Sequence, residues 1–229
     1  MAVNHDADST SGYEASLSTY GWSHVCAGDS RLLVVGVSIF LSGTVTSITY
    51  NSVGLTFIRA DAQGAYRSEL WYLIKPALGS NTITVNLSVS LTSIAGATSL
   101  TGVDQNFPVT ANNGANGTNN PASVSITTVK DNDWVIDTLA TSLATAPTVG
   151  SGQAQRWNQS GALGSGTGST KGPISPPAAT TMQWTGLGVP DSWALSAAAI
   201  KAAVPTYDNP FILSVPNTHM GIRNRVVSY

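Results

Sequence analysis

The sequence is poor in charge, and this narrows the classes of function that it can serve. Charged residues make up 10% of the 229 positions and the formal net charge is −2, whereas about a quarter of an average soluble domain is charged. No basic cluster occurs, so nothing favours binding to the phosphate backbone of a nucleic acid. The surface must instead be built from Ser, Thr, Asn, Gln and Gly, as in proteins that work outside a cytosol or inside an assembly.

Cysteine is scarce, and long apolar runs and a leader-like start are missing. Cys26 is the single cysteine, so no disulfide can form within the chain and the fold depends on packing. No apolar run approaches the roughly 20 residues of a membrane-spanning helix. The start, MAVNHDADST, lacks the basic and apolar regions of a secretory signal peptide. We therefore expect no membrane association, and the combination fits a phage particle protein that is made in the cytoplasm and released by lysis.

Residues for catalysis are few and badly spaced. A glycosidase needs two carboxylates across a cleft, and Glu69 could meet Asp104 or Asp137 only through a coincidence of folding. His24 and Cys26 would share one face of a strand, but no helix N-terminus or strained turn stands nearby to activate the thiol. Neither His24 nor the other two histidines belongs to a metal-spaced motif. We expect no enzyme, no cofactor and a structural His–Cys pair.

What the chain does contain is the hydrophobic pattern of an all-β protein. Arg31–Phe40 (RLLVVGVSIF) is a continuous apolar run between turn signals, which predicts a strand buried on both faces. Thr82–Ser90 alternates strictly between apolar and polar residues, which predicts a strand in a sheet with one solvated face, and Ile94–Val103 predicts a further strand of smaller residues. Turn residues predict one hairpin between Val45–Tyr50 and Leu55–Ile58 and a second between Ser123–Val129 and Asp133–Thr141. Ser192–Ala202 is rich in Ala, but its alternation favours a strand over a helix. About ten to twelve such strands predict a two-sheet β-sandwich with jelly-roll or related Greek-key connections. No exact repeat is visible, which argues against a solenoid or propeller.

The pattern divides the chain into three parts. Residues 1–15 are polar and acidic and predict an N-terminal arm, residues 16–203 form the sandwich, and residues 204–229 predict an extended C-terminal arm broken by prolines. The C-terminal arm either packs on its own domain or is exchanged between subunits. Its expected assembly contacts are four apolar anchors and two charged clamps: Phe211, Ile212, Leu213, Val215, Arg223 and Arg225.

Two further clusters invite a binding interpretation. Asp131, Asn132 and Asp133 gather oxygen ligands of the kind that Ca²⁺ prefers, although a hairpin turn explains the same residues and is the favoured interpretation. Trp157 is flanked by Gln155 and Arg156, as in a surface patch that stacks on a sugar or contacts a protein. The alternative, core packing, is what we expect for the other tryptophans, and it is also the favoured interpretation for Trp157.

A set of short motifs resembles a known kind of domain. RLLVVGV, SELWYLIKP, TGVDQ, QAQRWN and WALSAAAIK occur in this order between residues 22 and 202. They are similar to motifs of a β-sandwich domain family found in uncharacterised phage virion and bacterial surface proteins. The resemblance implies a fold and no catalytic residues.

The function expected from the sequence is therefore structural. We expect a non-enzymatic virion protein on the particle exterior, either decorating the capsid or forming a head or tail appendage. Its partners would be copies of itself and a protein such as the major capsid protein. The alternative is a carbohydrate-binding adhesin module that recognises a host surface glycan through Trp157.

Overall fold

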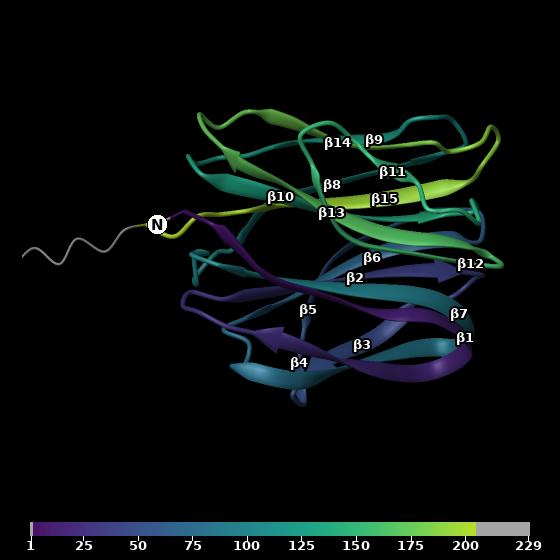
Figure 1. Cartoon of the computed structure of the whole chain (residues 1–229), viewed down its shortest axis with the longest axis horizontal. Coiled ribbons are helices and arrows are strands. Elements are labelled where there is room, and N and C mark those ends of the chain that lie inside the picture. Colours follow the sequence, from purple (N-terminus) through teal and green to yellow (C-terminus); the bar gives the residue numbers. More distant parts are fainter. Residues whose placement is uncertain (1, 205–229) are drawn as a thin grey trace, which may run out of the picture.

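The computed structural model describes residues 2–204, and all regular structure in this range is β-strand (Figure 1). The strands are β1 (Asn4–Cys26), β2 (Leu32–Phe40), β3 (Val45–Tyr50), β4 (Val53–Gly54), β5 (Thr56–Gln63), β6 (Tyr66–Ile74), β7 (Gly79–Thr101), β8 (Val109–Gly117), β9 (Ala122–Thr127), β10 (Asp133–Thr141), β11 (Thr148–Val149), β12 (Ala154–Gly161), β13 (Gly164–Ile174), β14 (Ala179–Thr185) and β15 (Trp193–Ile200). The predicted all-β class is confirmed, and Ser192–Ala202 contains a strand rather than a helix.

The strands form four layers (Figure 1). The three-stranded sheet β11-β14-β9 lies at the top of the view, above the five-stranded sheet β12-β13-β10-β15-β8. The third sheet has seven strands in the order β4-β3-β7-β2-β6-β5, with β1 on the free side of β7. Because β1 and β7 are each 23 residues long, they run through both lower layers, and the sheet folds over onto itself.

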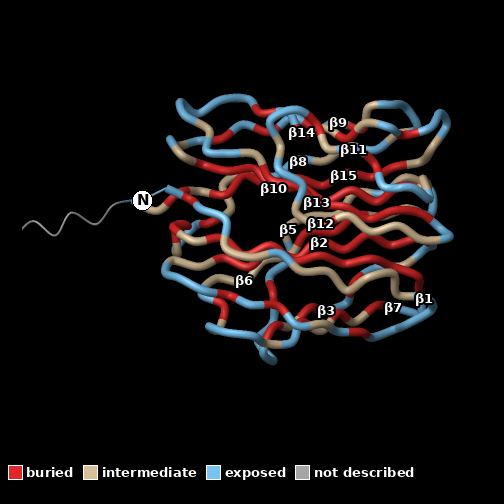
Figure 2. The backbone as a smooth tube through the Cα atoms, viewed as in Figure 1, coloured by how far each residue is buried: buried red, intermediate tan, exposed pale blue. Residues whose placement is uncertain are grey.

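The central apolar run forms a strand buried on both faces, as predicted. All nine residues of β2 are buried between β7 and β6. Leu33 and Val35 point into the core of the lower two layers, while Leu32 and Val34 point into the core shared with the five-stranded sheet. Figure 2 shows the resulting concentration of buried backbone in the middle layers. A strand covered on both sides needs no polar face, which explains the unbroken apolar sequence.

The four layers are two copies of one strand arrangement. In the second half, β8-β15-β10-β13-β12 faces β9-β14-β11. The first half has the same arrangement. One of its sheets runs from the N-terminal part of β1 through the C-terminal part of β7 to β2, β6 and β5. The facing sheet consists of the C-terminal part of β1, the N-terminal part of β7 and β3. Numbered along each half, the eight strands pair as 1-8-3-6-5 and 2-7-4. The orders 1-8-3-6 and 2-7-4 are those of an eight-stranded jelly roll.

Two irregularities of the ladders repeat as well. The β5–β6 ladder skips Ile58, and the β12–β13 ladder skips Arg156 at the corresponding place. The β1–β7 ladder skips Asp6, and the β8–β15 ladder skips Thr110. Bulges are characteristic features of a strand arrangement and not accidents. The two halves, residues 2–104 and 105–204, are therefore structural repeats, although the sequence shows no repeat.

The halves pack face to face about an approximate two-fold axis. β2 packs on β10, and these two strands are equivalent, since each is the third strand of its half. Every other major contact between the halves occurs twice. β15 packs on β5 and β6 while β7 packs on β12 and β13, and β8 packs on β5 while β1 packs on β12. Reciprocal pairs of this kind define an isologous interface.

These findings correct four expectations about organisation. The predicted arm 1–15 is largely strand, because Asn4–Glu14 pairs with β7 and Val3 is buried between the halves. The single sandwich expected over residues 16–203 is a pair of sandwiches. The strands expected at 82–90 and 94–103 are one strand, β7. The hairpin expected between 45–50 and 55–58 closes instead on β4, because Asn51 and Ser52 both have positive φ, as a two-residue hairpin turn requires, and β5 pairs with β6.

One end of the molecule, here called the junction end, gathers the loops 27–31, 75–78, 102–108, 128–132 and 175–178 and residues 201–204. The antiparallel registers bring these segments together, and both Ala2 and Val204 lie there (Figure 1). The link between the halves, residues 102–108, is one of these loops.

Candidate functional site at the junction end

Trp157 is not a surface platform. It exposes 7% of its area and belongs to a core cluster between the halves with Phe40, Ile94 and Ala140. Its indole lies against Gly96 and Gly168, where an added Cβ would overlap the ring. The core interpretation is therefore correct, and the proposed glycan-stacking role of Trp157 is wrong. The polar sequence neighbours of Trp157 suggest exposure, but Gly96 and Gly168, which make room for the indole, come from other strands.

The other members of that patch are engaged elsewhere. Arg156 donates from Nε to Thr170 Oγ1 at 2.7 Å, stacks over Trp134 at 5.8 Å and lies 3.9 Å from Asp8. Burial lowers the pKa of Arg156, and the nearby Asp8 opposes this shift. The Gln155 side-chain oxygen accepts a hydrogen bond from Asn158 at 3.1 Å. The three residues do not present one exposed surface.

The possible calcium ligands form a turn, but it is not the expected hairpin turn, because it joins β9 to β10 and these strands lie in different sheets. Asn132 has a φ of 67°, the left-handed conformation that Asn tolerates in turns. Asp133 is fully buried and uses its carboxylate to accept from the backbone N–H groups of Val129, Lys130 and Ala202. Asp131 accepts from Ser175 Oγ at 3.0 Å. No group of three His, Cys, Asp or Glu side chains suited to a metal ion occurs within residues 2–204.

The buried carboxylates lie in separate cores. Glu69 accepts from Val45 N, Arg67 Nε and Trp71 Nε1 in the first half. Asp137, in the second half, accepts from both the N–H and the hydroxyl of Ser169 and from Trp184 Nε1. Burial raises the pKa of Asp137 to about 7, against these hydrogen bonds, which lower it. The fold therefore does not join Glu69 and Asp137 across a common cleft.

His24 and Cys26 are a buried structural pair, as favoured. Both are 1% exposed on one face of β1. Burial lowers the pKa of His24 to about 4 and raises that of Cys26, so at neutral pH the imidazole is neutral and the thiol is protonated. Ser9 Oγ accepts from Trp22 Nε1 at 2.9 Å and shares a hydrogen bond with His24 Nδ1 at 2.8 Å. This arrangement links the two ends of β1 and does not generate a nucleophile.

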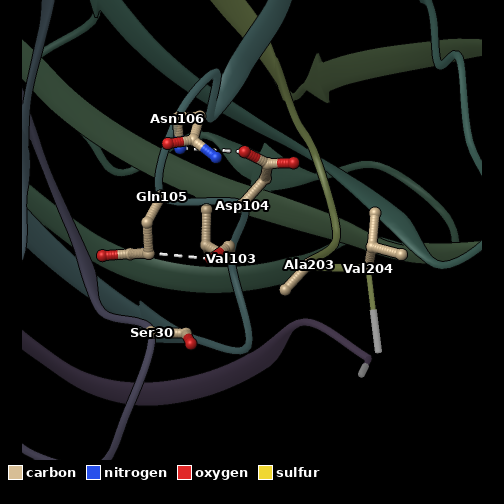
Figure 3. A pocket seen from close by; sticks show the side chains of 7 residues that line it. All are labelled: Ser30, Val103, Asp104, Gln105, Asn106, Ala203 and Val204. Carbon is tan, nitrogen blue, oxygen red and sulfur yellow. Dashed lines mark hydrogen bonds between the residues drawn. The ribbon is translucent and has the colours of Figure 1, made fainter. Parts of the chain in front are cut away.

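The structure contains a small pocket of about 220 Å³ at the junction end (Figure 3). It is lined by Ser30, Val103, Asp104, Gln105, Asn106, Ala203 and Val204. No sequence pattern beyond the TGVDQ motif pointed to this pocket, because its walls come from three segments that only the fold brings together. Its volume is below the range of typical small-molecule sites.

The charged groups of the pocket serve the link between the halves. Asp104 accepts from the N–H groups of Asn106 and Phe107 and lies 3.0 Å from Lys201 Nζ. The Phe107 N–H, followed by the Asn106 N–H and Lys201, lowers the pKa of Asp104 to about 2. An ionised carboxylate with these partners orders the loop and closes the first half against the second. It is poorly suited to act as a general acid or base at neutral pH.

Several apolar side chains are exposed at the junction end. Phe107 exposes 73% of its area, and four other exposed apolar residues occupy the same end: Val25, Leu78, Val129 and Val204. The described chain ends at Val204, in the pocket wall. The predicted assembly residues Phe211, Ile212, Leu213, Val215, Arg223 and Arg225 lie outside the described residues.

Comparisons with family models, curated proteins and solved structures found no match to this chain. Within residues 2–204, no helix has the length and apolar character needed to cross a bilayer.

Proposed function

We propose that this chain is a non-enzymatic structural protein on the exterior of a phage particle, where it associates with its own copies and docks on a larger structural protein such as the major capsid protein. The jelly-roll strand order supports this by analogy, since jelly rolls build many viral capsids, although they also build lectins. The low charge and the absence of a disulfide are consistent with it.

The observation that carries the proposal is the apolar character of the junction end. Phe107 and four other exposed apolar residues lie at the end of the molecule from which the chain continues into the segment 205–229. Soluble monomers rarely expose large contiguous apolar patches unless another surface covers them. Contacts between copies would bury this end, with Phe211 and Leu213 as anchors and Arg223 and Arg225 as charged clamps.

Light scattering of the full chain against a version ending at Ala203 tests the association. The full chain should form defined oligomers and the shortened chain should be a folded monomer. Phe107→Ser should weaken the oligomer, whereas Val189→Ser should not, because Val189 is equally exposed, at 74%, on a loop at the opposite end. Oligomers that survive both the truncation and Phe107→Ser would refute the contact.

Immunogold labelling tests the location. Serum raised against the purified chain should label the outside of phage particles recovered from the source culture on a density gradient. Signal confined to fractions without particles would overturn the virion assignment.

A further inference from the structure

The surface between the two halves has the symmetry of a dimer interface. Each major contact that the first half makes through β1, β5, β6 or β7 has a counterpart made by the equivalent strand of the second half, β8, β12, β13 or β15. The surface is continuous with two core clusters that contain residues from both halves. We propose that this surface is a two-fold recognition interface of a single jelly-roll unit, now held inside one chain, and that the partner it fits is the complementary half and not a second copy of the same half.

Two equivalent places in the interface show why the halves are complementary. The ladder registers place Arg59 of β5 at the position of Trp157 in β12, and Gly96 of β7 at the position of Ser196 in β15. At the first place, Trp157 packs on Gly96, which has no side chain to exclude the indole. The fit there is steric and apolar.

The second place is polar. Arg59 binds Asp61 through two hydrogen bonds of 2.8 and 2.6 Å and donates to Asn112 Oδ1 of β8 at 2.9 Å. Ser196 of β15 donates to Asp61 Oδ2 at 2.6 Å. The hydroxyl and amide of the second half thus satisfy a partly buried ion pair of the first half.

Pairing of like halves would violate both arrangements. Two second halves would place Trp157 against Ser196, where the position requires a glycine. Two first halves would place the Arg59–Asp61 pair against Gly96, which offers no hydroxyl to the carboxylate. A desolvated polar group without its partner and a steric overlap both disfavour the wrong pair. The interface therefore selects a first half for a second half.

Cutting the link in the folded chain tests this. A protease recognition sequence inserted after Phe107 follows the two exposed residues of the loop 102–108, Asn106 and Phe107, and keeps both N–H bonds to Asp104. After cleavage, we expect one species with the mass of the intact chain. Its unfolding midpoint should rise with protein concentration, as for a bimolecular complex, while that of the uncut control should not. Halves that unfold, aggregate or separate at micromolar concentration on cleavage would overturn the proposal.

Selectivity is measured by exchange. Cleaved protein of natural mass is mixed with cleaved protein carrying heavy isotopes, and native mass spectrometry follows the products. Light and heavy halves should recombine only as one first half with one second half. Pairs of two first halves or two second halves would refute the complementarity.

Matched variants locate the selective contact. In the cleaved protein, Trp157→Ala should weaken the association at least about 30-fold, the effect of removing a central aromatic residue from an interface. Gly96→Ser, which copies the residue of the equivalent position, should weaken it as well. Phe57→Ala is the control, because Phe57 lies on β5 but packs on Trp71 of its own half; its association should be unchanged. Equal effects of Trp157→Ala and Phe57→Ala would contradict the assignment.

Discussion

Replacing Trp157 by alanine should strongly destabilise the full chain. Trp157 exposes 7% of its area, and burying a tryptophan side chain to this extent removes on the order of 200 Å² of surface from water. At about 25 cal/mol per Å² this corresponds to about 5 kcal/mol as an upper estimate. Measured substitutions of this kind cost about 3–5 kcal/mol, and we expect a loss in that range.

Gly96, which lies against the indole of Trp157, supplies the second part of the prediction. Gly96→Ala alone should cost about 1–3 kcal/mol, because its methyl group would overlap the indole ring. In a Trp157→Ala background the same methyl group enters vacated space, so its cost should largely disappear. The two losses should therefore fail to add by more than about 1 kcal/mol.

Equilibrium urea unfolding of the four proteins in this cycle measures these values. Trp157→Phe, which keeps part of the apolar area, should fall between the wild type and the alanine variant. A loss below about 1 kcal/mol for Trp157→Ala, or strict additivity with Gly96→Ala, would refute the buried, glycine-lined position of this side chain.

Three further predictions follow from the buried titratable groups. Because the folded pKa of Asp137 is raised to about 7, its contribution to stability is full below about pH 4 and is lost as pH rises to about 7. The loss is on the order of 4 kcal/mol. Urea titrations between pH 4 and 8 measure this pH dependence of stability, and Asp137→Asn should flatten it. Because the pKa of His24 is lowered to about 4, its contribution is full above about pH 6.5 and is lost as pH falls to about 4; His24→Gln should remove this dependence, and an unchanged acid limb would contradict the burial. Asp104→Ala should lower stability by about 1–2 kcal/mol, because it leaves the N–H groups of Asn106 and Phe107 without their acceptor. Hydrogen exchange at those two amides should become faster. Asp131→Ala is the control and should change stability little, because the Asp131 carboxylate accepts from Ser175 in an exposed contact.

The sequence by itself determined which segments are strands and where several of them turn. The apolar run of β2, the alternation at the start of β7 and the strand over Asp133–Thr141 are local patterns, because burial on one or both faces of a strand is written in consecutive residues. Asn132 marked its turn for the same reason, since its positive φ suits an Asn side chain. The buried His24–Cys26 pair was also foreseeable from their shared face.

Only the tertiary structure decided which strands pair and what that pairing buries. The repetition of one strand order in both halves leaves no mark in the sequence, because each position requires only suitable size and polarity, and Arg59 and Trp157 can occupy equivalent places. Residues 4–14 of β1 looked like part of a polar arm because their partners in β7 lie 79 to 97 residues away in the chain, as Glu14 pairs with Ser93 and Asn4 with Thr101. Trp157 looked exposed because its local neighbours are polar, whereas its burial depends on Gly96 and Gly168 meeting it from other strands. Contacts across such separations depend on the assembled layers, and a local pattern cannot encode them.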